Sequence, residues 1–226
     1  MTILTTQAEE NHLKAIFKIA EREGKPVLTN AIAAAMNTAA ASVTDMLKRL
    51  ADKQLITYEK YRGVQLTEDG HRLATTLIRK HRLWETFLVK KLGFAWDQVH
   101  ELAEQLEHIQ GDALTARLDQ FLGHPRFDPH GEPIPDAEGH WTHVDQVSLA
   151  AMTAGQRGKV SNVADDSAVF LQYLNQLGLA LDSDIEVLEH FAYDHSVKVK
   201  IDARVAVLSE KVCQNLFVTL NKSKPS

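Results

Sequence analysis

Cysteine, long hydrophobic runs and a surplus of positive charge are all scarce in this sequence of 226 residues. The single cysteine, Cys213, excludes an internal disulfide framework and is typical of a reducing cytoplasm. No run approaches the roughly 18 apolar residues of a membrane helix, and the opening MTILTTQAEENH lacks the basic and then apolar order of a secretory signal. We therefore expect a soluble, cytoplasmic protein with no membrane partner, in which Cys213 fills the core from an apolar, strand-like run.

Charge is distributed unevenly along the chain. The net charge of −5 argues against non-specific binding of the whole protein to nucleic acid. Residues 1–63, however, hold nine Lys and Arg against seven Asp and Glu, whereas the remainder holds 16 against 23. A nucleic-acid surface is therefore expected near the N-terminus, although many neutral domains have a similar small excess.

The first 66 residues have the pattern of three helices and a hairpin. A helix is predicted from about 7 to 22 and ends at the breaker residues Gly24, Lys25 and Pro26. Thr29 is expected to cap AIAAAM, and the turn NTAA leads into a helix over 41–56 with apolar residues at helical period. The segment ITYEKYRGVQLT alternates like a hairpin that turns near Arg62.

This order predicts a winged helix-turn-helix, whose second helix lies in the major groove of DNA. Small and polar residues open that helix, and the wing is basic, so hydroxyls can reach phosphates or bases and alanines can touch thymine methyls. Asp45 is awkward beside DNA unless it accepts from cytosine or points away. The alternative is a protein-docking module of the same shape. The predicted DNA-binding residues are Thr38, Ala39, Ala40, Ala41, Ser42, Thr44, Asp45, Lys48, Lys60 and Arg62.

The segment VHELAEQLEH gives the clearest indication of a metal-binding site in the sequence. On a helix it places His100, Glu104, Glu107 and His108 on one stripe, close enough to share one ion, and imidazole with carboxylate suits a divalent transition metal. A solvated helix face is the plainer interpretation. A second pair four residues apart, His81 and Glu85 on the preceding predicted helix, favours a metal site built between helices.

From Asp145 onward the chain has short alternating strands. Several such strands with turn signals predict a small β-barrel, interrupted by one helix-like stretch, SAVFLQYLNQLGL. The predicted strands are VSLAAM, GKVSNV, DIEVLEHF, VKVKID, RVAVLS and LFVTL.

Taken together, these segments resemble the diphtheria-toxin-repressor and manganese-transport-regulator family of metal-dependent transcriptional repressors. The resemblance covers residues 7 to about 135, and the β-rich segment is similar to the SH3-like (FeoA-like) domain of longer members. It is carried by ENHLKAIF, SVTDMLKRL, YEKYRGVQLTEDG, RKHRLWETFL, ExxEH at Glu104 to His108, and HPRFDPHGEPIP.

The resemblance implies a fold and its domains. The fold is mainly α with a small β domain: a winged helix-turn-helix in 1–66, a helical metal-binding and dimerisation domain with a linker in 67–144, and the SH3-like FeoA-like barrel in 145–226. The surface of helices 68–122 is expected to form a homodimer, because a palindromic double-stranded DNA operator needs two recognition helices.

The resemblance also implies the metal ligands. Asn11, Glu104, Glu107 and His108 match the metal-sensing switch, and His81, Glu85 and His100 match a supporting site. An acidic residue before the barrel helix can join the supporting site. Here it is Asp166, whose alternative role, with Asp165, is to cap that helix.

Glu104 indicates the metal. Iron-responding members tend to have Cys at this position and Met at that of Asn11, whereas manganese-responding members have acids. Hard carboxylate oxygens suit Mn(II), so Mn(II) is predicted, with Fe(II) as the alternative and Zn(II) or Co(II) able to bind in vitro. Lys14 replaces a second acid of the manganese subgroup, which argues against a dinuclear site. Glu10 and His12 are left out, because a helix turns them about 100° from Asn11.

The predicted function is therefore a metal-dependent DNA-binding repressor of metal-uptake genes, not an enzyme. Three alternatives remain open: an iron-responsive repressor of the same family, a winged-helix regulator that ignores metal, and a metalloenzyme. No HExxH motif supports the metalloenzyme.

Overall fold

The computed structural model describes residues 4–23, 26–59 and 62–221. The chain divides into two compact units, each described by itself. One consists of 1–81, 105–116 and 135–140, and the other of 82–104, 117–134 and 141–226. Within the described ranges, no helix has both the length and the apolar composition to cross a bilayer.

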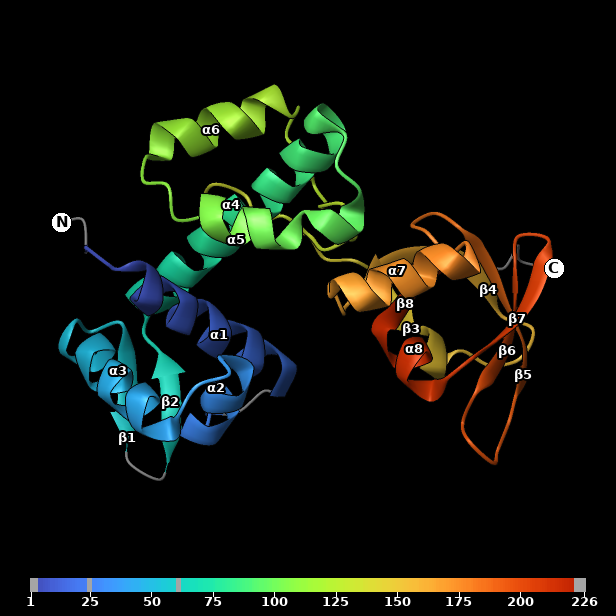
Figure 1. Ribbon diagram of the computed structural model, residues 1–226, viewed down its shortest axis with the longest axis horizontal. Coiled ribbons are helices and arrows are strands. Elements are labelled where there is room, and N and C mark those ends of the chain that lie inside the picture. The colour runs from blue at the N-terminus through green and yellow to red at the C-terminus, as the bar shows by residue number, and fades with distance from the viewer. Residues whose placement is uncertain (1–3, 24–25, 60–61, 222–226) are drawn as a thin grey trace. The chain divides into compact units, whose positions relative to one another are not determined.

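The first unit begins with the predicted winged helix-turn-helix (Figure 1). Apolar residues at helical period point into one core, which includes Ile16, Phe17 and Leu47, each at most 2% exposed. Strands β1 and β2 pair antiparallel with Ile56 opposite Leu66. The elements are α1 (Gln7–Glu23), α2 (Thr29–Ala35), α3 (Ala40–Asp52), β1 (Ile56–Glu59) and β2 (Gly63–Leu66).

Two details of the sequence prediction are wrong in this unit. Thr29 is the first residue of α2 rather than its cap; Leu28 takes the cap position and forms no side-chain bond there. Helix α3 ends at Asp52, four residues earlier than expected, because the chain turns at Gln54 (φ 59°) and enters β1 at Ile56. The expected breakers Gly24 and Lys25 lie outside the described residues.

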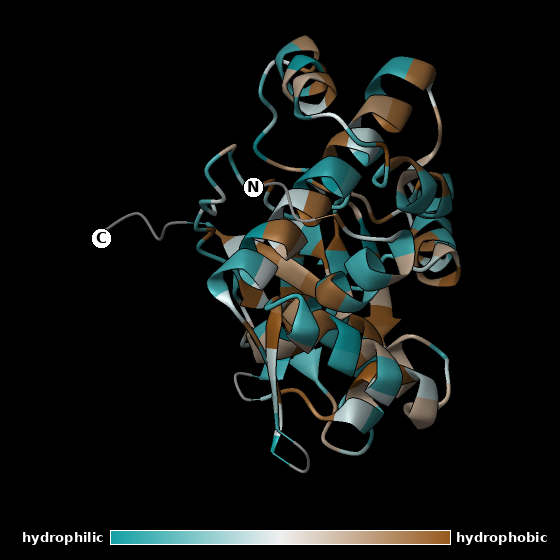
Figure 2. Cartoon of the chain, turned by 90° about the vertical axis from the view of Figure 1, so that its left-hand side faces the viewer, coloured by the Kyte–Doolittle hydropathy of each residue, from teal (hydrophilic) through white to brown (hydrophobic). Residues whose placement is uncertain are grey.

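Helices follow the wing and carry the candidate metal ligands. Gly70 lies where the first of them, α4, crosses the chain before β1: a Cβ at this position would come within 1.9 Å of the Leu55 carbonyl oxygen. Figure 2 shows hydrophobic and hydrophilic residues alternating along the helices of the chain, as expected for amphipathic helices. These elements are α4 (Glu68–Leu92), η1 (Trp96–Gln98), α5 (His100–Leu106) and α6 (Asp112–Phe121).

The second unit ends in a six-stranded antiparallel sheet of order β3-β8-β4-β5-β6-β7. Alternate residues of the strands point into a core that is closed by helices α7 and α8. The elements are β3 (Val147–Ser148), η2 (Leu149–Ala151), β4 (Arg157–Val163), α7 (Ala168–Leu177), β5 (Asp184–His190), β6 (Val197–Ile201), β7 (Arg204–Leu208), α8 (Glu210–Asn215) and β8 (Leu216–Leu220).

The predicted strands and the helix of this sheet domain are confirmed, with two corrections. The segment VSLAAM forms only a two-residue strand before the turn of 3-10 helix η2. Cys213 is fully buried, as expected of core filler, but it lies on the short helix α8 and not in a strand. Ser209 caps this helix, and its hydroxyl accepts a hydrogen bond from the Val212 amide.

The loop HPRFDPHGEPIP packs against strand β4. The Val163 amide donates to the His130 carbonyl oxygen at 3.0 Å, and the Asn162 side chain donates to the Gly131 carbonyl oxygen at 3.2 Å. Gly131 has φ +86°, and a Cβ there would lie 2.0 Å from the Ser161 carbonyl oxygen. Only glycine therefore allows this close approach.

Candidate metal centre and DNA-binding surface

Glu107 lies at the centre of a buried polar cluster in the first unit. It follows the C-terminal end of α5, and its side chain is completely buried. The carboxylate oxygens lie 2.6 and 2.8 Å from Lys14 Nζ on α1, and one of them lies 2.6 Å from His81 Nδ1 on α4. Three segments far apart in the sequence therefore meet at this carboxylate.

His108 extends this cluster toward the start of α1. Its Nε2 lies 3.7 Å from Glu107, and its Nδ1 lies 2.6 Å from the Glu10 carboxylate, which also accepts a bond from Thr5. Glu10 was left out of the predicted site, because helix geometry turns it away from Asn11. Its long side chain nevertheless reaches His108, whereas His12 bonds the Ala8 carbonyl oxygen within its own helix.

Asn11 gives the observation that tests whether this cluster fits a metal ion. Its Oδ1 is buried and has no hydrogen-bond partner within the described part of the chain. A buried acceptor without a donor is costly, and a cation would relieve that cost. Asn11 lies one turn before Lys14, whose Nζ contacts Glu107. An amide oxygen, a carboxylate and the His108 imidazole are donor types that suit a first-row divalent ion. The residues present therefore fit a metal.

A second polar cluster lies in the other unit. His100 Nδ1 lies 3.5 Å from Glu85 on α4 and 3.3 Å from Asp166, the residue expected to reach this site. Ser167, and not Asp166, takes the cap position of α7, where it forms no side-chain cap bond. The carboxylate of Asp166 is therefore directed to His100 instead of to the helix end.

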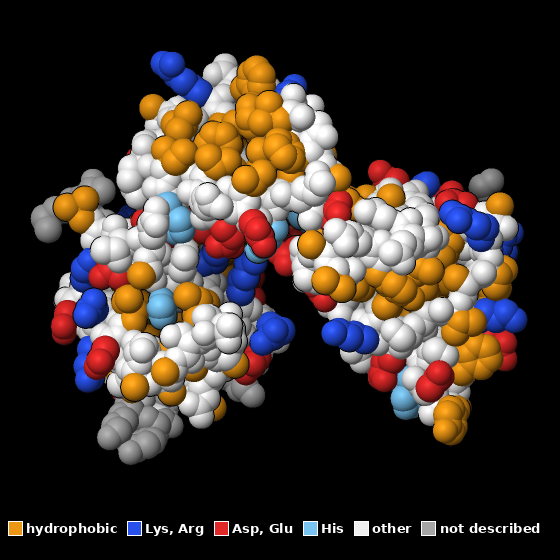
Figure 3. All heavy atoms as spheres, viewed as in Figure 1, with side chains coloured by type: hydrophobic (Ala, Val, Ile, Leu, Met, Phe, Trp, Pro, Cys, Tyr) orange, Lys and Arg blue, Asp and Glu red, His pale blue; other side chains and the backbone are white. Residues whose placement is uncertain are grey.

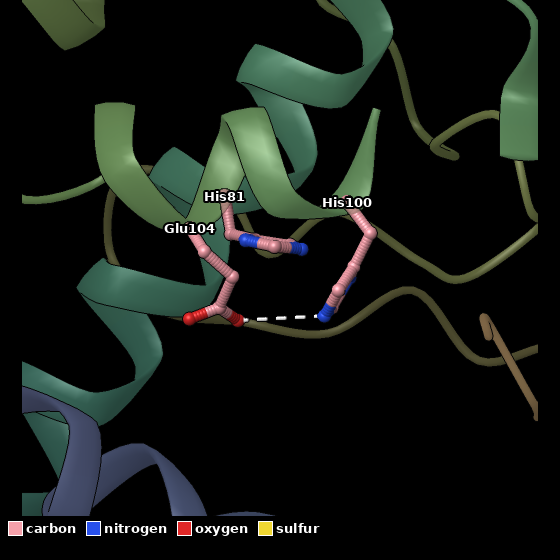
Figure 4. A group of neighbouring side chains, drawn as sticks. All are labelled: His81, His100 and Glu104. Atoms are coloured by element: carbon pink, nitrogen blue, oxygen red, sulfur yellow. Dashed lines mark ion pairs between the residues drawn. The ribbon is translucent and has the colours of Figure 1, made fainter. Parts of the chain in front are cut away.

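Figure 4 shows the ion pair between His100 Nε2 and Glu104, which are one helical turn apart on α5 at 3.7 Å. His81, which is drawn with them, belongs to the first unit. His81 was predicted with the supporting residues, yet its Nδ1 contacts Glu107 of the predicted switch. The metal-binding roles of these residues stay predictions.

The sequence did not predict that Asp128 and His130 lie next to Glu85. All three are buried, with one ligand atom each within 4.8 Å of the others. Burial lowers the pKa of His130, but its hydrogen bond to Glu85 and the charges of Glu85 and Asp128 outweigh this and raise it to about 9. Burial, with the charges of Glu85 and Glu132 added, raises the pKa of Asp128 to about 7 against the opposing charges of Arg82 and His130. The signal for both residues is the acid and the imidazole of DPHG, which lies within the family-like segment HPRFDPHGEPIP.

A third group, Asp136, Glu138 and His140, is exposed. The Asp136 carboxylate accepts bonds from the backbone amides of Glu138 and His140, as in an ordinary turn. This group is therefore explained by local structure.

The predicted DNA-binding residues lie on or beside α3 and the wing. Most are exposed, and Thr44, which is partly buried, donates its hydroxyl to the Ala40 carbonyl oxygen and is occupied within the helix. Asp45 pairs with Lys48 at 3.1 Å, which partly neutralises the awkward acid. On the wing, Arg62 pairs with Glu59, while Lys60 lies outside the described residues.

The N-terminus of α3 is exposed and has no side-chain cap. Its cap residue, Ala39, has no side chain that could bond the first amides, so these N–H groups can reach a phosphate. Residues 38–42 are all exposed.

Comparisons with known protein families match the chain in three consecutive parts. Residues 4–64 match "Iron dependent repressor, N-terminal DNA binding domain", residues 67–136 match "Iron dependent repressor, metal binding and dimerisation domain", and residues 147–220 match "FeoA domain".

Curated relatives include two diphtheria toxin repressors. That of Corynebacterium jeikeium is 36% identical over 126 residues, which are 56% of this chain and 52% of that protein. That of Corynebacterium diphtheriae is 32% identical over 182 residues, which are 79% of this chain and 80% of that protein. The chain spans about half the length of several other curated relatives it matches, such as the Mycobacterium tuberculosis iron-dependent repressor IdeR at 54%.

Solved structures of similar proteins cover nearly the whole chain. A manganese-dependent transcriptional repressor in complex with manganese is 34% identical, with a TM-score of 0.87, and the match covers 94% of this chain and all of that one. The manganese regulator SloR is 31% identical, with a TM-score of 0.79 over 98% of this chain and all of that one. The chain therefore belongs to the diphtheria-toxin-repressor and manganese-transport-regulator family, whose members include the iron-dependent repressors.

Proposed function

We propose that this protein is a cytoplasmic transcriptional repressor that binds DNA when a divalent metal ion is bound. The observation that carries the proposal is the position of α1. This helix packs in the core of the winged helix, contacts His108 through Glu10 and Glu107 through Lys14, and carries the buried, unbonded Asn11 oxygen one turn before Lys14. An ion bound there is held in part by the DNA-binding domain itself.

The proposed switch site consists of Asn11, Glu104, Glu107 and His108, and Glu10 is added because it contacts His108. The ion supplies a positive charge that these donors can share. Ligands that come from both α1 and the end of α5 bind it best in one orientation of α1, so metal shifts the population toward that orientation. The supporting site consists of His81, Glu85, His100 and Asp166, with His81 also in contact with Glu107.

Mn(II) is the proposed metal and Fe(II) the alternative. The carboxylate of Glu104 is a hard donor where a thiolate would favour a softer ion. Among the similar solved structures, one is described as a complex with manganese, and structures of ScaR hold Cd²⁺ or Zn²⁺. Zn(II) and Co(II) are therefore expected to bind in vitro, and in the cell the supply of each metal matters as much as its affinity.

The proposed DNA target is a palindromic operator read by a homodimer that controls metal-uptake genes. Exposed residues 38–42 at the start of α3 would meet base edges, and Arg62 on the wing would neutralise a phosphate. The dimer would use the apolar surface of the helices between 68 and 122, which holds exposed Phe121 and Leu92.

A binding titration tests the proposal. Duplexes selected from a random pool with Mn²⁺ are titrated with the protein alone and with Mn²⁺, Fe²⁺ or Zn²⁺, and binding is measured by fluorescence anisotropy. We expect metal to strengthen binding at least 20-fold and chelator to reverse it, because the coupling between two sites is typically of this order.

Two variants separate the parts of the proposal. His108→Ala should abolish the metal effect, and Ser42→Glu should abolish DNA binding while metal still binds. The control is His140→Ala, which removes a histidine of the exposed group and should behave like the parent protein. Metal-independent binding that His108→Ala leaves unchanged would support the metal-independent regulator and contradict the proposal.

A further inference from the structure

Lys14 contributes a buried positive charge to the proposed switch site. Its side chain is 8% exposed, and its Nζ lies 2.6 and 2.8 Å from the two oxygens of Glu107, whose side chain is completely buried. A charge in such surroundings needs an opposite partner at short range. The ammonium therefore neutralises the carboxylate that is expected to bind metal.

This ion pair joins two parts of the chain that lie 93 residues apart. Lys14 is on α1 of the winged helix, and Glu107 directly follows α5. Asn11 lies one turn before Lys14 on the same helix, so both belong to the same helix face. The contact therefore runs between the same two elements that a metal ion at this site would join.

A metal ion and the ammonium compete for one carboxylate. Both oxygens of Glu107 already contact Lys14, and one also contacts His81. Two positive charges a few ångströms apart repel strongly in a partly buried site, because the effective dielectric constant is low. A first divalent ion must share Glu107 or displace the ammonium, and a second one is disfavoured.

We propose that Lys14 is a tethered cation that stands in for one metal ion at Glu107. It holds α1 to the end of α5 in the metal-free protein, and it confines this site to a single divalent ion. The inference rests on the proposed function, because it takes Glu107 to be a metal ligand.

The test compares Lys14→Met with Lys53→Met. Lys53 is a matched control because it also pairs with a buried acid of α1, Glu9, at 2.8 Å, and its removal changes the net charge equally. Mn²⁺ affinity is measured by competition with a fluorescent chelator. Lys14→Met should bind Mn²⁺ at least tenfold more tightly than the parent protein, because Glu107 is then left without its counter-charge. Lys53→Met should stay within twofold.

A second readout examines the metal-free state. Hydrogen–deuterium exchange in α1 should be at least tenfold faster in metal-free Lys14→Met than in the parent protein, and Mn²⁺ should restore protection. Circular dichroism checks the fold. Should Lys14→Met fail to fold, Lys14→Gln, which keeps a hydrogen-bond donor but not the charge, carries the same expectations.

The outcomes separate this inference from the proposed function. A parent protein that binds Mn²⁺, with a Lys14→Met variant that matches it in affinity and in exchange, overturns the role of Lys14 alone. A parent protein that binds no Mn²⁺, Fe²⁺ or Zn²⁺ at the concentrations of the DNA titration overturns the metal-dependent function and the inference with it.

Discussion

His130 carries a buried positive charge that is expected to contribute to the stability of the folded protein. It is 2% exposed and its pKa is raised to about 9, because the hydrogen bond to Glu85 and the charges of Glu85 and Asp128 outweigh the lowering by burial. Its Nε2 also lies 2.9 Å from the Trp96 carbonyl oxygen, and the two rings stack. The protonated ring thus links Glu85 on α4 to the backbone of η1.

This charge predicts how stability depends on pH. The pKa of His130 in the folded protein lies above its ordinary value of 6.5, so its contribution is complete below pH 6.5 and is lost as the pH rises through 9. The free energy of unfolding of the metal-free protein should fall by about 2 to 3 kcal/mol across this range. Trp84, Trp96 and Trp141 all lie in this unit, so tryptophan fluorescence during urea unfolding measures it.

The matched variant is His130→Gln, which keeps a hydrogen-bond donor but cannot titrate. Its stability should depend much less on pH between 7.5 and 9. The raised pKa of Asp128, about 7 against an ordinary 3.8, makes the stability fall as the pH rises between these two values, so this group contributes mainly below that range. Parallel slopes for both proteins would contradict the assignment of the charge to His130.

At the scale of elements, the loop around Gly131 shows the limit of sequence reasoning. The prediction placed HPRFDPHGEPIP among the family signatures but gave it no partner. In the structure its backbone bonds strand β4 through Asn162 and Val163. This contact depends on segments more than 30 residues apart, which no local pattern encodes.

Gly131→Ala should destabilise this unit by about 3 kcal/mol or more. The added methyl group would meet the Ser161 carbonyl oxygen, and alanine is strained at φ +86°. The control is Gly123→Ala, which has φ +76° but nothing within 4 Å of the new methyl group, so it should cost about 1 kcal/mol from strain alone. Urea unfolding followed by tryptophan fluorescence gives both values, and equal losses would contradict the packing argument.

Helix ends also show where prediction from the sequence succeeds and fails. Helix α1 opens with a capping box: the Thr6 amide donates to Glu9 at 2.8 Å, and the Glu9 amide donates to the Thr6 hydroxyl. The segment TQAE at residues 6–9 has the residue types and the spacing of this motif, but it was not part of the sequence prediction. By contrast, the cap assigned to Thr29 follows the same preference, yet the structure starts α2 at that residue.

At the scale of the molecule, apolar side chains gather in Figure 3 near α6. In the second unit Leu92, Phe94 and Phe121 are 57%, 38% and 62% exposed, and the ring of Phe121 lies 6.2 Å from that of Phe87. Large apolar residues exposed together mark an interaction surface. The matched metal-binding and dimerisation domain makes a second copy of the chain the expected partner.

Phe121→Glu should weaken the homodimer at least tenfold, because the interface would bury a charge without a partner. Sedimentation velocity over a range of concentrations measures the dimer constant. The control is Tyr193→Glu, a fully exposed aromatic residue in the turn after β5, which should leave the constant unchanged. A dimer equally stable in both variants would place the interface elsewhere.

The order of the elements, the fold class and most of the candidate ligands could be predicted from the sequence. Hydrophobic periodicity and turn residues are local patterns, so they predict helices, strands and turns. The spacing of the His and Glu residues is that of one helix face, so it predicts which side chains lie together on a helix. The tertiary structure alone decided the contacts of those ligands. Lys14, Glu10 and His130 reach Glu107, His108 and Glu85 across distances of 45 to 98 positions in the chain. Such contacts depend on how helices and loops pack, which is a property of the whole fold and not of any one segment.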